Sequence, residues 1–393
     1  MRDSGILTPL TYNGSMHRQR SIYYTRGIIF TAVFLPLIIV SSKFCNLSDL
    51  KSINDLPLAD NNDSVKGDAL TAIKIRLNTG FVLNEHKFTP LREDSIVIVI
   101  QVHTRLTYLR YLIKSLSKAR GISSVLLIFS HDYYDRNIND LVQSVDFCKV
   151  MQIFYPYPSH SHKTCTRSEG SRVKCNTPEF YKHNKAELAQ MKHHWWWQAN
   201  YVFDQLTITR RHRGLVFFLD EDFYIAEDVL YVLKLMYKNV NVLCPYCKIL
   251  AIGNQKKPFH DKTYSKNTAK VNVFNWVTGQ TNLGYAFNRS TWNIIRDCAP
   301  YFCSYNDYNW DRAMNYLSNN CRNGAHYDVN NCRSESWLSD IEKELRSAGK
   351  AGRLFPRKLV LDEVHLNSVD TFLAGKGWYK KPDQELCISM TSS

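Results

Sequence analysis

Apolar and polar positions alternate in blocks along the chain from residue 95 onward, and each block has the length of one strand or one helix. Continuous apolar runs rich in Val and Ile are typical of strands buried on both faces, whereas apolar positions three and four apart are typical of helices. Strands are predicted at 95–102, 125–129, 150–155, 215–219 and 249–252, and helices at 108–118 and 185–206. Alternation of this kind predicts an α/β fold with a mostly parallel, doubly wound sheet.

The first part of the chain has a different pattern. Residues 27–40 are apolar apart from Thr31, and Ile22 to Tyr24 extend this run across Thr25 and Arg26 to about the shortest length that spans a bilayer. Four arginines precede this run and Lys43 follows it, so the positive-inside rule predicts a cytosolic tail at 1–26, a transmembrane signal-anchor at 27–42 and a luminal remainder. A cleaved signal peptide is the alternative, but the polar segment before the apolar run is long and lacks an obvious cleavage site.

Residues 43–90 are predicted to form a luminal stem. Asn, Asp, Ser and Lys dominate this stretch between 46 and 68, and such a composition cannot bury a core. The catalytic domain is therefore expected at 91–393.

Composition and charge narrow the functional class. The chain has 393 residues, of which 44% are hydrophobic and 13% aromatic, so it can bury a large core. A formal charge of +14 is compatible with nucleic-acid binding, but the basic residues are dispersed and no nucleic-acid-binding signature is present. A basic groove for an anionic small molecule explains the same charge.

Cysteine usage agrees with a luminal domain. Ten of the eleven cysteines lie beyond Cys45, and several form close pairs in the sequence that predict disulfides in an oxidising compartment. The CPYC sequence at 244–247 also resembles a redox motif, but it follows a helix in mid-chain, where a redox motif is not expected. Glycosylation sequons at Asn46, Asn62 and Asn288 fall on the same predicted luminal side.

Polar groups gather where the predicted parallel strands end. QVHTR at 101–105, SHD at 130–132 and DED at 220–222 each close an apolar run, and such ends form the ligand crevice of open α/β sheets. The acidic run is suited to Mg²⁺ or Mn²⁺, although an acidic turn before a helix is the structural alternative. Neither GxGxxG nor GxxxxGK[ST] is present, so the pattern favours a metal-assisted nucleotide-sugar site.

Five segments in this order resemble the N-acetylglucosaminyltransferase II family. They are QVHTR at 101–105, FSHD at 129–132, QMKHHWWW at 190–197, FLDED at 218–222 and YNDYNWD at 305–311. The resemblance implies a GT-A fold, UDP-N-acetylglucosamine (UDP-GlcNAc) as donor and Mn²⁺ as cofactor. It also implies transfer in β1,2 linkage to the α1,6-arm mannose of N-glycans by a Golgi membrane enzyme.

The same resemblance implies roles for individual residues. Asp311 is the implied catalytic base, Asp222 the metal ligand, and Asn282, Tyr308 and Trp310 the acceptor contacts, with Tyr305 beside them. The implied donor site comprises Gln101, Val102, His103, Thr104, Arg105, Asp132, Gln190, Met191, Lys192, His193 and His194. The implied disulfides join Cys165 to Cys175, Cys244 to Cys247, Cys298 to Cys321, and Cys303 to Cys387.

Structural interpretations compete with these roles. The run Trp195 to Trp197 is more typical of core packing with one surface ring than of three sugar platforms. His193 and His194 are also typical buried or capping histidines. Asp311 has the position of an acidic residue in the first turn of a helix.

The chain departs from the family after Cys321. A His-containing segment that supplies a second metal ligand in the family is absent, and Cys332 has no evident partner. His326 is a candidate substitute, and His365 a weaker one. A skipped exon and a genuine variant with weaker metal binding are both open. The functional alternatives are therefore a catalytically impaired glycan-binding or scaffold homologue, and a related transferase with another acceptor.

Overall fold

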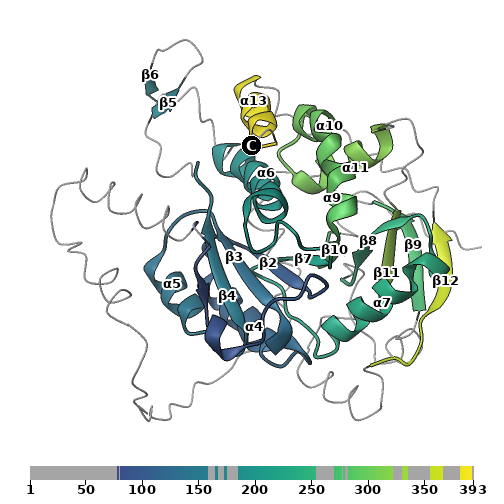
Figure 1. Ribbon diagram of the computed structural model, residues 1–393. Helices are drawn as coiled ribbons and strands as arrows, with labels where there is room; N and C mark the ends of the chain where they lie inside the picture. The colour runs from purple at the N-terminus through teal and green to yellow at the C-terminus, as the bar shows by residue number, and fades with distance from the viewer. Residues whose placement is uncertain are drawn as a thin grey trace, which may run out of the picture.

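A computed structural model shows how these segments fold. It describes residues 78, 80–157, 164–166, 172–174, 185–253, 270–276, 278, 282–321, 330–334, 355–365 and 381–391. Within them, one large twisted sheet separates two layers of helices (Figure 1).

The large sheet has ten strands in the order β1-β4-β3-β2-β7-β10-β8-β11-β9-β12. Its strands are β1 (Val82–Leu83), β2 (Val97–Val102), β3 (Leu126–His131), β4 (Lys149–Phe154), β7 (Val216–Asp220), β8 (Cys247–Ala251), β9 (Lys270–Asn275), β10 (Tyr285–Phe287), β11 (Asn330–Ser334) and β12 (Val360–His365). A separate pair is formed by β5 (Thr164–Thr166) and β6 (Arg172–Lys174).

Strand direction divides the sheet into two regions. The neighbours β4, β3, β2 and β7 are all parallel, as the apolar runs predicted. Beyond β7 the sheet is mixed, because β10 runs antiparallel to both β7 and β8, and β9 runs antiparallel to β11. The α/β class is thus confirmed, and the parallel region is the part that the sequence pattern identified.

Side chains of the parallel strands alternate between two cores. Ile98 and Ile100 pack into one core, with helices α4 (Leu106–Leu116), α5 (Arg136–Gln143) and α7 (Val229–Leu243). Val97 and Val99 pack into the other, with α6 (Lys185–Asn200), α9 (Arg289–Asp297), α10 (Ala299–Ser304), α11 (Trp310–Asn320) and α13 (Lys381–Ser389). Burial on both faces explains why these strands are continuously apolar rather than alternating.

The folded unit begins earlier than the boundary predicted at residue 91. β1 pairs antiparallel with β4, and the Asn78 side chain exchanges hydrogen bonds with the backbone of Phe154 at 2.7 and 3.0 Å. Composition marked residues 46–68 as unable to form a core, but it did not indicate that residues 78–90 dock against the sheet. The predicted tail, signal-anchor and sequons at Asn46 and Asn62 lie outside the described residues. No helix in the described part of the chain is long and apolar enough to cross a bilayer.

Three of the four disulfides are confirmed. Cys244 bonds to Cys247 at the turn from α7 to β8, Cys298 to Cys321, and Cys303 to Cys387. The last bond joins α10 to α13 across 84 positions of sequence. Cys175 lies outside the described residues, as do the side chains of Cys165 in β5 and Cys332 in β11. Cys148 is buried as a free thiol, and burial raises its pKa to about 12.

Candidate active site

The carboxyl ends of β2, β3 and β7 meet at one edge of the sheet. They carry Gln101 to Arg105, Ser130 to Asp132 and Asp220 to Asp222, as the sequence predicted. β10 begins at this edge and runs away from it, because Tyr285, its first residue, lies opposite Phe218 in the antiparallel pair with β7. The loop that carries Asn282 before β10 therefore lies beside the acidic end of β7.

A buried polar network connects β2, β3 and α6. Asp132 contacts the Nδ1 atoms of both His103 and His194 with its two carboxylate oxygens. Ser130 Oγ lies 2.7 Å from Nε2 of His194, and Gln101 Nε2 lies 3.4 Å from Nε2 of His103. These contacts assign each imidazole as the tautomer with its proton on Nδ1, donating to Asp132 and accepting at Nε2.

Burial and charge set the ionisation of this network. Burial opposes ionisation of Asp132, but the imidazoles of His103 and His194 outweigh it and hold the pKa of the carboxyl well below its usual range. Burial also lowers the pKa of His194, and Asp132 only partly opposes that shift. The neighbouring His131 is fully buried, and its pKa is lowered to about 3. The network thus holds the Asp132 carboxylate ionised between two imidazole rings, and it can orient hydrogen-bond groups toward a ligand.

Glu221 and Asp222, which directly follow β7, have different surroundings. Glu221 is buried and accepts hydrogen bonds from the backbone N–H groups of His103, at 2.8 Å, and Arg105, at 3.3 Å. Burial raises the pKa of Glu221, against these hydrogen bonds and the charge of Arg105. Asp222 forms an ion pair with the Arg105 guanidinium. Part of the acidic run is therefore balanced by the protein itself, and Glu221 shapes the loop after β2.

Asp222 offers one oxygen donor for a divalent cation at this edge, and it is paired with Arg105. Its carboxylate is a hard oxygen ligand, and its partner Arg105 is 27% exposed at the side chain, so the pair is open to an incoming anion. His103, Asp132 and His194 also lie close enough together to hold a metal. Each of those ring nitrogens already has a hydrogen-bonding role within the network, so Asp222 is the better-suited ligand. His326 lies outside the described residues, as does the side chain of His365.

Asp311 occupies the first turn of α11, as the structural interpretation predicted, and its carboxylate also faces the loop before β10. One carboxylate oxygen accepts from the backbone N–H of Arg312 at 2.9 Å, and the other accepts from the Asn282 amide at 3.3 Å. Trp276 at the end of β9 donates to the Asp311 carbonyl at 2.8 Å. Since Asn282 adjoins the acidic end of β7, the fold brings Asp311 to the same sheet edge as Asp222.

The aromatic residues pack more deeply than the sequence suggested. Trp195, Trp196 and Trp197 are all buried, so none is the surface ring that was expected. Trp310 is 4% exposed and stacks on Trp195 with centroids 4.9 Å apart and planes inclined by 1°. Tyr305 and Tyr308 are half-buried, and Tyr305 stacks on Tyr316. Among the implied sugar platforms, the two tyrosines keep accessible surface, whereas Trp310 mainly supports the loop from beneath.

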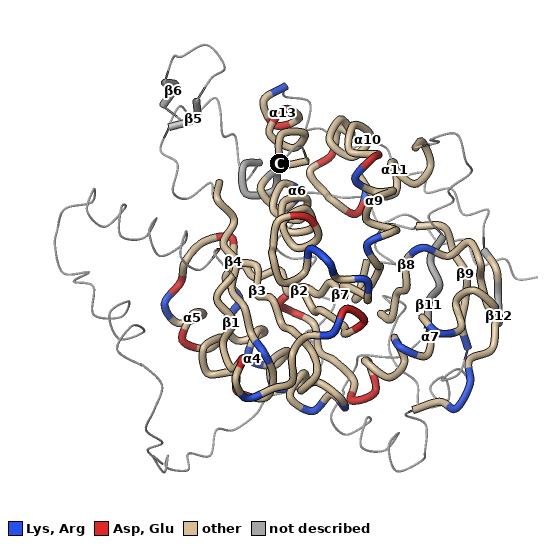
Figure 2. The backbone as a smooth tube through the Cα atoms, in the orientation of Figure 1, with Lys and Arg blue, Asp and Glu red and all other residues tan. Residues whose placement is uncertain are grey.

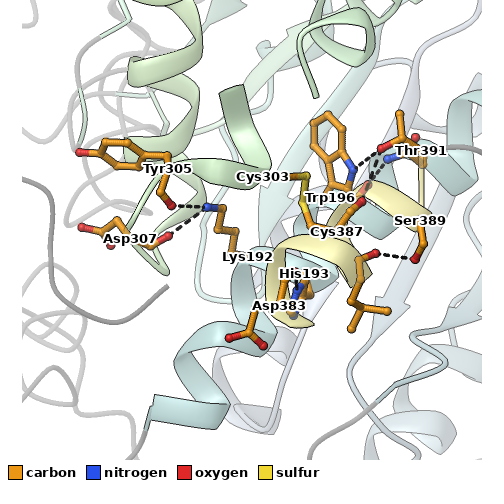
Figure 3. Close-up of a disulfide and its surroundings, with 12 residues drawn as sticks. Lys192, His193, Trp196, Cys303, Tyr305, Asp307, Asp383, Cys387, Ser389 and Thr391 are labelled. Atoms are coloured by element: carbon orange, nitrogen blue, oxygen red, sulfur yellow. Dashed lines mark hydrogen bonds between the residues drawn. A yellow bond between two sulfur atoms is a disulfide. The ribbon is translucent and has the colours of Figure 1, made fainter. Parts of the chain in front are cut away.

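The implied donor residues divide into three groups. Gln101, His103 and His194 join the network around Asp132, and Arg105 joins Asp222. Val102 is buried in the sheet core, Thr104 is exposed in the loop after β2, Gln190 is buried, and Met191 is half-buried. Lys192 and His193 contact other elements: Lys192 donates to carbonyls of the 305–307 loop, and His193 Nε2 lies 2.8 Å from the Asp383 carbonyl of α13 (Figure 3).

Sequence reasoning did not single out Glu221, Ser130 or Gln198 as individual site residues. Gln198 Nε2 donates to the Gln101 side chain at 3.0 Å and is buried on α6. The signal available for Ser130 and Glu221 was their position within polar strand ends. Gln198 follows the three tryptophans and carries no comparable signal.

Charge placement is consistent with a small anionic ligand. Figure 2 shows Lys and Arg distributed over many elements of the described chain rather than gathered along one of them. Acidic residues lie at the end of β7. The basic residues are thus dispersed over the described part of the chain, as they are along the sequence.

Comparison with known proteins identifies the family. The N-acetylglucosaminyltransferase II family model matches residues 72–329. The alpha-1,6-mannosyl-glycoprotein 2-beta-N-acetylglucosaminyltransferase of Sus scrofa is 32% identical over 330 residues, covering 75% of this chain and 73% of the relative. The Arabidopsis thaliana protein of the same name is 34% identical over 250 residues, covering 59% of this chain and 55% of the relative. A crystal structure of S. aureus TarS residues 1–349 gives a TM-score of 0.30 at 12% identity, covering 63% of this chain and 58% of that one. On the strength of the family model and the animal relative, this chain belongs to the N-acetylglucosaminyltransferase II family.

Proposed function

We propose that this protein is an inverting, divalent-metal-dependent glycosyltransferase of the GT-A type in complex N-glycan synthesis. It transfers N-acetylglucosamine from UDP-GlcNAc in β1,2 linkage to the α1,6-arm mannose of an N-glycan. Family membership supports the transferase class, and the names of the relatives in pig and Arabidopsis thaliana support the donor sugar and the acceptor arm.

One structural observation carries the proposal. The Asn282 amide, which donates to Asp311, stands in the loop that antiparallel pairing places beside the acidic end of β7. An inverting transferase needs a carboxylate to remove the proton from the attacking hydroxyl, and a positively charged region for the leaving diphosphate. Asp311 would meet the first requirement, and Arg105 together with a divalent cation held on Asp222 would meet the second at the same sheet edge.

Each group has a chemical role in this proposal. Asp311 accepts the proton of the mannose hydroxyl, and the Asn282 amide orients its carboxylate. Arg105 keeps part of its hydrogen bonding to Asp222 and directs its other N–H groups to an oxygen of the diphosphate, since a guanidinium group is well suited to phosphate. A bound Mn²⁺ on Asp222 would neutralise charge on the diphosphate. The network around Asp132 presents hydrogen-bond groups to the nucleoside.

The location of the protein in the cell and the protein ligands of its metal ion are part of the same proposal. The N-terminal apolar run and its flanking arginines support a type II single-pass protein of the Golgi membrane with its catalytic domain in the lumen. Mn²⁺ is the proposed ion, with Asp222 as one protein ligand and His326 as the candidate second one.

A direct assay tests the proposed function. Purified luminal protein is incubated with UDP-GlcNAc, Mn²⁺ and an N-glycan that has a free α1,6-arm mannose, and the product linkage is determined by NMR spectroscopy. A β1,2-linked product on that arm supports the proposal. Transfer to another position would indicate a related transferase.

The departure after Cys321 favours one second candidate, a glycan-binding homologue without catalysis. Glycan binding with no transfer, at Mn²⁺ concentrations far above the usual requirement, would identify it. Sequencing the transcript across residues 317–337 shows whether a metal-ligand segment is encoded there.

A further inference from the structure

Lys192 is an ammonium group buried in the interior, away from the network around Asp132. It lies on α6 with no exposed surface, and its Nζ donates to the backbone carbonyls of Tyr305 at 3.0 Å and Asp307 at 3.1 Å (Figure 3). Burial lowers its pKa well below the usual value, while the charges of Asp307 and Asp383 oppose that shift. A buried amine is costly unless it is hydrogen-bonded, so these two carbonyls account for its presence there.

The segment that Lys192 binds is tightly organised. Asp307 is 1% exposed, and its carboxylate accepts from the Asn309 backbone at 2.9 Å and pairs with Arg312 at 2.8 Å. The Asp307 backbone also donates to the Tyr305 carbonyl at 2.8 Å. These bonds join residues 305–309, which precede Trp310, to Arg312 in the first turn of α11, the turn that also carries Asp311.

A second contact from α6 supports the other end of this loop. Trp195 lies three residues after Lys192, and residues with this spacing share one helix face. It stacks on Trp310, the residue before Asp311. One face of α6 therefore holds the segment before Asp311 at two points, by hydrogen bonds at 305 and 307 and by ring stacking at 310.

We propose that Lys192 is a positioning residue for Asp311, which it acts on through the 305–309 loop, rather than a contact for the nucleotide-sugar donor. The inference rests on the proposed function, because it assigns Asp311 the role of base. The positioning role of Lys192 requires a buried donor that can bond two carbonyls at once, which a lysine amino group with several N–H donors provides. Loss of that donor leaves the carbonyls of Tyr305 and Asp307 without this partner and frees the loop to move.

The test compares Lys192→Met with the wild type and with Lys234→Met, which removes an exposed lysine on α7. We expect Lys192→Met to lower kcat by roughly tenfold to a hundredfold, the effect of a displacement of about 1 Å at a reacting group. KM for the acceptor rises, UDP affinity measured by calorimetry stays within about twofold, and amide exchange of residues 304–311 becomes faster. Lys234→Met changes none of these quantities.

Lys192→Gln provides a second measurement if the methionine variant does not fold. The glutamine amide is shorter and neutral but retains N–H donors, so we expect exchange at 304–311 and kcat to lie between wild type and Lys192→Met. Failure of both variants to fold would overturn the proposal in favour of a purely structural lysine.

Two further outcomes separate the alternatives. A large loss of UDP affinity with unchanged exchange at 304–311 would overturn the proposal and support the donor role implied by the sequence. If the wild type itself transfers no sugar to the acceptor, the proposed function fails. Exchange at 304–311 in the variants then still reports whether Lys192 holds the loop.

Discussion

Replacement of Asp311 by Asn is the most direct test of the active-site assignment. The substitution removes the negative charge and the proton-accepting ability while keeping the size of the side chain. Its amide oxygen can still accept from the Arg312 backbone, as Asp311 does at 2.9 Å. Its amide nitrogen would face the Asn282 amide, which can rotate to present its oxygen instead of the donor it now places 3.3 Å from Asp311. The fold is therefore expected to survive the change.

The expected loss follows from the role of the carboxylate. General base catalysis contributes about 10²- to 10⁴-fold to a reaction rate, or roughly 3 to 5 kcal/mol in the activation free energy. We expect Asp311→Asn to lower kcat by this factor, with UDP affinity unchanged. Because the lost hydrogen bond is partly exposed and replaceable, its effect on unfolding free energy should be about 1 kcal/mol or less.

The assay measures initial rates of UDP release and sugar transfer at saturating donor and acceptor. Asp297→Asn at the end of α9 is the matched control, because it removes an exposed carboxylate. Retention of more than about a tenth of wild-type kcat in Asp311→Asn would refute the assignment of Asp311 as base. Equal losses of kcat and UDP affinity would indicate a disturbed donor site instead.

Three other predictions address the metal, the C-terminal helix and pH. Removal of divalent ions by a chelator should abolish transfer, and Asp222→Asn should raise the Mn²⁺ concentration for half-maximal rate by roughly tenfold or more, which a metal titration measures. Replacing Cys303 and Cys387 together by Ser opens a loop of 84 positions and should lower the unfolding free energy by about 4.5 kcal/mol, measured by denaturant titration against the wild type with its disulfides intact. Burial lowers the pKa of His193 to about 4 from 6.5. The unfolded state then binds more protons below pH 6.5, so stability is complete above that pH and is lost as pH falls toward 4. His193→Gln, which keeps a donor for the Asp383 carbonyl, should remove about 3 kcal/mol of that pH-dependent loss. Parallel slopes in the two proteins would contradict this prediction.

Figure 3 shows why α13 and the 305–309 loop belong to one region despite their distance in sequence. His193 and Trp196 of α6 contact Asp383 and Thr391 at the two ends of α13, and the disulfide at Cys387 joins it to α10. Lys192 on the same helix contacts the 305–307 carbonyls. Reduction is therefore expected to loosen the surroundings of Asp311 before the network around Asp132, which amide exchange can follow.

The sequence by itself determined the parallel region of the sheet and the polar edge of the site. Val97 to Val102 and Leu126 to His131 are buried on both faces, so their apolar runs identified them without knowledge of neighbours. Parallel strands place their carboxyl ends together, which is why Arg105, Asp132 and Asp222 could be assigned to one crevice. The cysteine pairings followed from family resemblance, and three of them are present.

Only the tertiary structure decided how those residues are used. Glu221 and Asp222 are adjacent in the chain, yet one accepts from backbone N–H groups while the other pairs with Arg105. Lys192 and His194 belong to one motif, but their side chains leave α6 on different faces, toward the 305–309 loop and toward Asp132. A sequence motif records which residues are neighbours along the chain, whereas helix periodicity and packing decide which side chains meet.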